Sequence, residues 1–302
     1  MNESHEWTGP SADPHDVQFG DVIERTTVED ADDYDAVLVG EPYDGAVLGR
    51  IGAAEAPDAV RHALVGVKTH HFETGDVTAV ADLGDADLPD GDVSTVQRTL
   101  ETTTKRVHRT DAFPVFVGGD NSLTVPNVRP LLSDSVGVLS FDAHLDCREV
   151  LDEPTSGTPY RQLFEDGLDD LAVVGARDFE TAGDYDDYLV SQGGTVHPAR
   201  DVENDPVETV REALSGLDAD SVYVSLDTDV LDQSHAPGVS APTPGGLSTH
   251  ALYEALSAAV ADPRVVGFEV VECAPPLDES GRTTRAVSRA IAHVLAEVTN
   301  RE

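Results

Sequence analysis

Short apolar runs alternate with amphipathic segments along most of this chain. The runs predict buried strands at 36–40, 113–117, 136–141, 171–175, 221–226 and 265–271, with another strand near Thr195. Helical spacing predicts helices from Pro57 and over 93–109, 160–165, 179–190, 207–214, 249–261 and 282–298, with a short helix after Ser122. Strands that alternate with helices favour parallel pairing and right-handed crossovers. We therefore predict an α/β fold, a three-layer α/β/α sandwich with a central, mainly parallel sheet.

Two polar stretches interrupt this pattern. Residues 1–33 are polar, acidic and contain proline, which predicts an irregular N-terminal arm. Trp7, the only tryptophan, is expected to anchor this arm on the body of the protein. Residues 74–92 are rich in Asp and Gly and are expected to form a loop. No repeat or low-complexity linker divides the remainder, so residues 34–302 are predicted to form one domain.

Two of the predicted strands end in groups of metal-binding residue types. The strand at 136–141 leads into Asp142, His144 and Asp146, and the strand at 221–226 leads into Asp227 and Asp229. Residues two apart on an extended chain point to the same side, so each group converges. Five ligands exceed what one small cation needs, and bridging carboxylates would suit a pair of divalent ions that ionises water. Oxygen ligands with one imidazole favour Mn²⁺ over Zn²⁺, with Mg²⁺ as a weaker competitor.

Composition and charge indicate the cellular environment of the protein and exclude some classes of partner. The formal net charge is −39, and Lys68 and Lys105 are the only lysines. This composition is typical of proteins in a salt-rich cytoplasm, where screening makes self-repulsion tolerable, and it argues against nucleic acid and anionic membranes as partners. Cys147 and Cys273 are too few for a disulfide framework. No apolar stretch approaches the ~18 residues of a membrane span, so we expect a cytoplasmic protein.

Three motifs resemble the signatures of the ureohydrolase family, which contains arginases, agmatinases and formimidoylglutamases. They are Gly118-Gly119-Asp120-Asn121-Ser122, Ser140-Phe141-Asp142-Ala143-His144-Leu145-Asp146 and Ser225-Leu226-Asp227-Thr228-Asp229-Val230-Leu231-Asp232. Further blocks that resemble the family are residues 40–53 with Pro57 and Arg61, and residues 272–278 with 281–283. The resemblance covers residue 36 to the end of the chain, and it is specific because separate blocks occur in the family's order. It implies an arginase-like fold.

The resemblance also implies roles for the clustered residues. Asp142 and Asp227 would bridge two Mn²⁺ ions, Asp146 would complete one site, and His144 with Asp229 would complete the other. Asp146 would also act as the catalytic acid/base, and Glu272 would pair with the amidinium group of the substrate.

Asn121 departs from the family pattern, which has a histidine ligand at this position. An amide oxygen can bind Mn²⁺, but it is neutral and weaker than imidazole, so the metal near Asn121 is expected to be loosely held. The loop after the central motif carries Ser156 and continues to Gln162 as Ser-Gly-Thr-Pro-Tyr-Arg-Gln, where arginases and agmatinases have a histidine. This loop, Arg148, and the segment Pro237-Gly238-Val239-Ser240-Ala241-Pro242 resemble formimidoylglutamases.

The substrate class follows from these details. Formiminoglutamate carries two carboxylates, and Arg148 and Arg161 are candidates to bind them, with surface or structural salt bridges as the alternative role. Ser156 is a further candidate substrate contact, or a residue that caps the loop.

The resemblance thus implies a binuclear manganese hydrolase that converts N-formimino-L-glutamate to L-glutamate and formamide in histidine degradation. An agmatinase or another guanidino hydrolase is the alternative enzyme. A catalytically weak, metal-binding regulatory homologue is the alternative of another class. A homo-oligomer, trimer or hexamer, is expected from the family.

Overall fold

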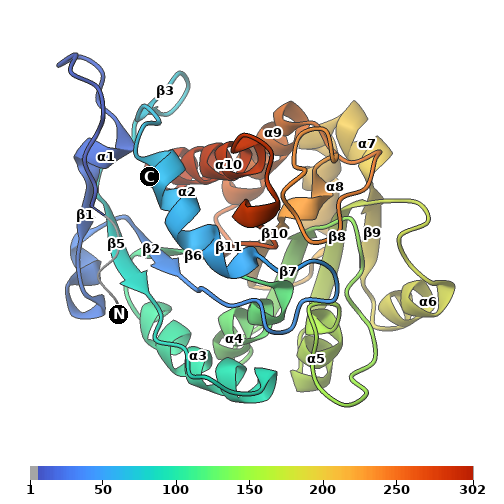
Figure 1. Cartoon of the computed structure of the whole chain (residues 1–302). Coiled ribbons are helices and arrows are strands. Elements are labelled where there is room, and N and C mark those ends of the chain that lie inside the picture. Colours follow the sequence, from blue (N-terminus) through green and yellow to red (C-terminus); the bar gives the residue numbers. More distant parts are fainter. Residues whose placement is uncertain (1–5, 302) are drawn as a thin grey trace.

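A computed structural model describes residues 6–301 and contains a nine-stranded sheet at its centre (Figure 1). Every neighbouring pair of strands in this sheet is parallel. In spatial order the strands are β1 (Ile23–Arg25), β5 (Val80–Asp85), β2 (Ala36–Gly40), β6 (Phe113–Val117), β11 (Val265–Val271), β10 (Ser221–Asp227), β7 (Val136–Phe141), β8 (Asp170–Ala176) and β9 (Thr195–Pro198). A separate antiparallel pair consists of β3 (His70–His71) and β4 (Gly75–Asp76).

Helices cover both faces of the sheet (Figure 1). One layer contains α2 (Ala56–Leu64), α7 (Ala199–Asn204), α8 (Pro206–Gly216), α9 (Thr249–Val260) and α10 (Arg282–Val298). The other layer contains α3 (Val93–Val107), α4 (Thr124–Val128), α5 (Pro159–Asp166) and α6 (Gly183–Ser191). The three-layer sandwich predicted from the sequence is confirmed.

The strands read as continuous apolar runs because both of their faces are buried. On β2, Ala36 and Leu38 belong to the core beneath α2, α8, α9 and α10, whereas Val37 and Val39 belong to the core beneath α3, α4 and α5. The predicted strands at 36–40, 113–117, 136–141 and 265–271 have the bounds that the pattern indicated.

The predicted loop at 74–92 is wrong in its centre, because β5 occupies residues 80–85. The polar residues within this strand interrupt the apolar run that would have predicted it. Asp82 and Asp85 bind the buried guanidinium of Arg61, at 3.0 Å from Nη2 and 2.5 Å from Nη1. The remaining oxygen of Asp82 accepts a hydrogen bond of 3.0 Å from Trp7 Nε1, which confirms Trp7 as an anchor. Partners elsewhere in the chain therefore compensate charges that a local pattern assigns to solvent.

The arm is not irregular throughout. Within residues 1–33, the chain forms α1 (Phe19–Val22), the edge strand β1, and a 3₁₀ helix at Val28–Asp33. β1 has only three residues, too few to show a strand pattern of their own. It pairs in parallel with β5, a strand that the sequence pattern did not predict.

The helix predicted at 179–190 begins later, at Gly183, with Asp184 and Asp186 in its first turn, where acidic residues complement the helix dipole. Residues 179–182 instead form a loop beside the carboxyl ends of the strands. None of the helices within residues 6–301 has the length and apolar character needed to cross a membrane.

Candidate metal centre and active site

The predicted ligands follow neighbouring strands of the sheet. β7 and β10 are adjacent, with Phe141 opposite Leu226 in the register. Their carboxyl ends are therefore level, and the groups that follow Phe141 and Leu226 meet at one edge of the sheet, which is where open parallel sheets form their sites. β11 and β6, on the other side of β10, lead into Glu272 and into Asn121 at the same edge.

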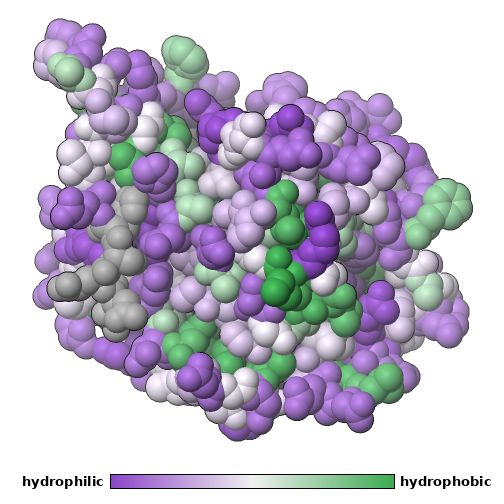
Figure 2. All heavy atoms as spheres, viewed as in Figure 1, coloured by the Kyte–Doolittle hydropathy of each residue, from purple (hydrophilic) through white to green (hydrophobic). Residues whose placement is uncertain are grey.

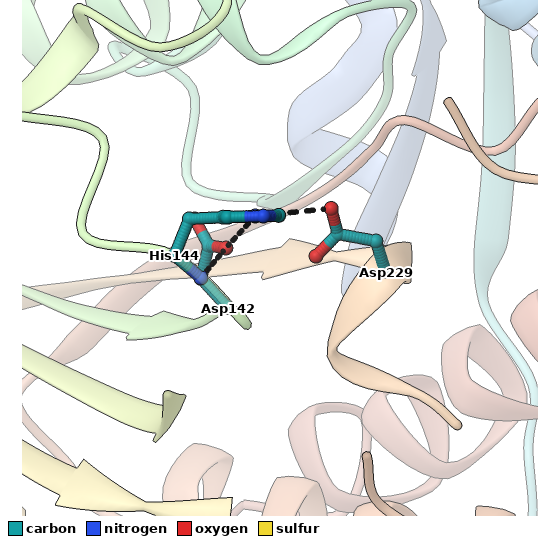
Figure 3. Close-up of side chains that lie close together, drawn as sticks. All are labelled: Asp142, His144 and Asp229. Atoms are coloured by element: carbon teal, nitrogen blue, oxygen red, sulfur yellow. Dashed lines mark hydrogen bonds and ion pairs between the residues drawn. The ribbon is translucent and has the colours of Figure 1, made fainter. Parts of the chain in front are cut away.

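The five predicted carboxylate and imidazole ligands lie together in two groups. Asp142, His144 and Asp229 form one group, and Asp142, Asp146 and Asp227 form the other, with the ligand atoms of each group within 4.8 Å of one another. Figure 3 shows the imidazole of the first group between the two carboxylates, with His144 Nδ1 3.2 Å from Asp229 Oδ2 and 3.5 Å from Asp142 Oδ1. Asp142 is common to both groups, as a bridging ligand would be, while Asp227 belongs to the second group alone.

Local hydrogen bonds fix the shape of both strand ends. Asp142 Oδ1 accepts from the backbone N–H of His144 at 2.7 Å, and Asp227 Oδ1 accepts from the N–H of Asp229 at 2.8 Å. Each Asp thus forms the turn that brings the residue two positions later back beside it. Asp146 has a positive φ of 43°, a conformation that is strained for a residue with a side chain.

The electrostatics of the clusters fit a cation. Burial first, and then the neighbouring carboxylates, raise the pKa of Asp227 well above its usual value. Burial likewise raises the pKa of Asp142 to about 6. Burial alone would favour neutral His144, but the carboxylates of Asp142 and Asp229 raise its pKa to about 12.

Within the described chain, Asp142 Oδ2 and Asp229 Oδ1 are buried without a hydrogen-bond partner. Unpartnered buried carboxylate oxygens are costly, and a divalent cation would compensate them. The donor set, oxygen-rich with one imidazole, suits Mn²⁺.

Asn121 lies beside the second group. Its Nδ2 donates to Asp146 Oδ2 at 2.6 Å, and its backbone N–H donates to Glu272 Oε1 at 3.0 Å. The other amide atom, Oδ1, lies 2.6 Å from the hydroxyl oxygen of Thr124. The structure therefore brings Asn121 to the site predicted for it.

A cavity of about 200 Å³ opens onto both groups. Glu272 lines this cavity and is buried, with Ser240 Oγ donating to its Oε2 at 2.6 Å. Burial, then the charge of Asp120, raise the pKa of Glu272 to about 8. A positive φ of 61° at Glu272 is a further strained position in the site. A buried carboxylate held at both oxygens is suited to bind a planar cation such as an amidinium.

The other predicted contacts divide into two sets. Arg148 and Ser156 line the cavity, and Ser156 Oγ also accepts from the N–H of Leu48 at 3.1 Å, which joins two loops at the cavity mouth. Arg161 is absent from the described residues that line the cavity. Its guanidinium carbon lies 3.3 Å from the ring centroid of Tyr188, and its Nε donates to the carbonyl of Cys147 at 3.2 Å. Arg161 therefore supports the loop that carries Arg148.

Sequence reasoning missed two residues at the site. Glu180 Oε2 lies 3.7 Å from His144 Nε2, the imidazole nitrogen that faces away from the carboxylates. The sequence pattern placed Glu180 inside a helix at 179–190, whereas the helix begins at Gly183 and Glu180 lies in the loop before it. Ser240 was part of a motif matched to formimidoylglutamases, but no local signal connected it to Glu272, which is 32 positions away.

Comparisons with known proteins agree with this geometry. The arginase family profile matches residues 34–296. The chain is 57% identical to a formimidoylglutamase of Halobacterium salinarum over 96% of this chain and 97% of that protein. The crystal structure of a Bacillus subtilis formimidoylglutamase superposes with a TM-score of 0.89 and 30% identity, over 97% of this chain and 96% of that one.

A crystal structure of Trypanosoma cruzi formiminoglutamase with Mn²⁺ also superposes, with a TM-score of 0.83 and 26% identity, over 92% of this chain and 100% of that one. The match to the Halobacterium salinarum sequence covers 96% of this chain, and the two structural superpositions cover 97% and 92% of it. The chain described here therefore belongs to the arginase family.

Proposed function

We propose that this protein is a formimidoylglutamase, a hydrolase that cleaves N-formimino-L-glutamate to L-glutamate and formamide. One observation carries the proposal: the cavity that opens onto the carboxylate groups is lined by both an anionic side chain, Glu272, and a cationic one, Arg148. The substrate has the complementary charges, an amidine at one end and carboxylates at the other. The relatives with 57% and 32% identity, from Halobacterium salinarum and Bacillus subtilis, are both named formimidoylglutamases.

The protein's own residues would orient and protonate the substrate. Glu272, held by Ser240 Oγ and by the N–H of Asn121, binds the amidinium and fixes the plane of its carbon. Arg148, on the exposed loop at the mouth, binds a substrate carboxylate. Asp146 lines the cavity and belongs to the second carboxylate group, so it can carry a proton to the leaving nitrogen.

Two Mn²⁺ ions are proposed for each chain. His144 and Asp229 would hold one, Asp146 and Asp227 with Asn121 would hold the other, and Asp142 would be shared. Bound there, the ions would supply the Lewis acid that lowers the pKa of water and polarises the amidine. A calorimetric titration of the metal-free protein should give two Mn²⁺ per chain, with the weaker step weakened further, but still measurable, in Asn121→Ala.

A substrate panel tests the function. The purified, Mn²⁺-loaded protein in molar KCl should show its highest kcat/KM with formiminoglutamate, against agmatine, arginine, guanidinobutyrate and guanidinopropionate. Guanidinopropionate belongs in the panel because a guanidinopropionase of Pseudomonas aeruginosa is 35% identical over 82% of this chain. Turnover of agmatine without turnover of formiminoglutamate would reverse the choice in favour of an agmatinase. One bound ion and no hydrolysis of any amidine would favour the regulatory homologue.

The cellular setting is part of the proposal. Cys147 and Cys273 are buried free thiols, which suits a reducing cytoplasm, and the formal net charge of −39 suits high salt. We further propose a role in histidine degradation and a trimer or hexamer in solution. Sedimentation equilibrium in molar KCl measures the oligomer, and a monomer would contradict it.

A further inference from the structure

A chain of buried polar side chains runs from the metal centre into the core. Asp146 Oδ2 accepts from Asn121 Nδ2 at 2.6 Å, and Asn121 Oδ1 lies 2.6 Å from Thr124 Oγ1. Thr124 Oγ1 in turn lies 2.6 Å from Glu269 Oε1. Thr124 and Glu269 are completely buried and Asn121 is 1% exposed, so solvent does not supply hydrogen bonds to this chain.

The Thr124 hydroxyl has one hydrogen for two oxygen neighbours. Glu269 is the other acceptor, and its Oε2 also receives hydrogen bonds from Asn127 Nδ2 and the hydroxyl of Tyr223, at 2.8 Å and 3.2 Å. Burial raises the pKa of Glu269, and these donors oppose that rise by stabilising the ionised carboxylate, which is the stronger acceptor for the Thr124 hydrogen. When Thr124 donates to Glu269, the oxygen of the Asn121 amide faces another oxygen with no hydrogen between them.

A half-turn of the Asn121 amide removes this conflict, because Oδ1 and Nδ2 exchange places with almost no change in shape. Nδ2 then donates to Thr124 Oγ1, and Oδ1 lies beside Asp146 Oδ2. Two acceptor oxygens side by side are favourable only when a cation or proton lies between them. The half-turn therefore suits a metal-loaded site, whereas the amide hydrogen bond to Asp146 suits the metal-free site.

We propose that Thr124 and Glu269 are positioning residues that turn the amide oxygen of Asn121 toward the metal centre. The inference rests on the proposed function, since it concerns the metal site of that hydrolase. In this arrangement Glu269 orients the Thr124 hydroxyl, and Thr124 accepts from the amide and so selects its ligating orientation. Groups behind a metal ligand commonly change metal affinity about 10- to 100-fold.

Thr124→Val tests this relay of Asn121, Thr124 and Glu269, because the substitution preserves the shape of the side chain and removes the hydroxyl. The readout is the affinity for Mn²⁺, measured by calorimetric titration of metal-free protein in molar KCl without substrate. Thr124→Val should weaken one of the two binding steps about tenfold or more. Thr124→Ser keeps the hydroxyl and should retain the affinity within about twofold. Thr124→Ala replaces the valine variant if thermal melting shows that the latter does not fold.

Thr104→Val is the matched control. Thr104 is also completely buried, and its hydroxyl donates to the carbonyl of Pro126 at 2.6 Å, outside the relay. Its substitution should lower the melting temperature by a similar amount and leave both Mn²⁺ affinities unchanged. An equal loss of affinity in Thr104→Val and Thr124→Val would overturn the proposal, because it would indicate a general packing effect.

A double-mutant cycle shows whether Thr124 acts through Asn121. In an Asn121→Ala background, Thr124→Val should have no further effect on Mn²⁺ affinity, whereas an undiminished effect would overturn the proposal. Failure of the proposed function is recognised separately, since it appears as lack of formiminoglutamate turnover by the wild-type protein with normal Mn²⁺ binding.

Discussion

Replacing Ser240 with alanine should weaken the binding of the substrate's amidinium group by Glu272. The substitution removes one hydrogen bond of 2.6 Å to a buried carboxylate and leaves the 3.0 Å bond from the Asn121 N–H. A hydrogen bond to a charged group contributes about 1.5–3 kcal/mol. Because water can enter the cavity and occupy the vacated position, we expect the lower figure, which corresponds to about a tenfold loss in kcat/KM. The loss should appear mainly in KM, since Glu272 binds the amidinium in ground and transition states alike.

The pH dependence gives this prediction a second signature. Burial, opposed by the hydrogen bond from Ser240, sets the pKa of Glu272 at about 8. Loss of the donor raises this pKa further, so fewer molecules hold the ionised carboxylate at neutral pH, and the deficit should shrink as the pH rises above 8.

The assay is the steady-state hydrolysis of formiminoglutamate in molar KCl between about pH 6.5 and pH 9, a ~300-fold range of proton activity that spans the pKa of Glu272. Ser234→Ala, at an exposed position in the same loop, is the control and should match the wild-type protein. An unchanged kcat/KM in Ser240→Ala, or a deficit independent of pH, would refute the role of Ser240.

The remaining predictions concern the metal centre and the two arginines. Arg148→Ala should raise KM for formiminoglutamate on the order of tenfold. Arg161→Ala should chiefly lower the melting temperature. If both variants raised KM equally, the conclusion that Arg148 but not Arg161 contacts the substrate would be contradicted. Asn121→His should tighten the weaker Mn²⁺ site about tenfold or more, and an unchanged affinity in calorimetry would argue against Asn121 as a ligand. Burial raises the pKa of Asp142 to about 6, so its contribution to the stability of the metal-free protein is present below pH ~4 and is lost as the pH rises through 6. The melting temperature of the metal-free wild-type protein should therefore fall as the pH rises over that range. The fall should be smaller in the Asp142→Asn variant, and thermal melts at each pH measure the difference.

Two errors in the secondary-structure prediction share a physical cause. β5 contains Asp82 and Asp85, which bind Arg61 from α2, and this partner lies more than twenty positions away in the sequence. A window of neighbouring residues assigns such carboxylates to solvent. The loop at 179–182 was predicted as helix for a similar reason, because the position of Glu180 near His144 depends on how β7 and β8 pair.

The sequence by itself determined the layers of the fold and the main ligands. Continuous apolar runs followed by amphipathic segments leave few alternatives to a parallel sheet covered on both faces. The spacing of Asp142, His144 and Asp146, and of Asp227 and Asp229, sets which side each residue faces, because that depends only on local backbone geometry.

The tertiary structure decided what depends on distances between remote segments. It brought Arg148 to the cavity and packed Arg161 against Tyr188, although both arginines follow the same motif. It also connected Ser240 to Glu272 and Thr124 to Glu269. No local pattern encodes these pairs, since each is set by the order of strands in the sheet, which follows from the packing of the whole chain.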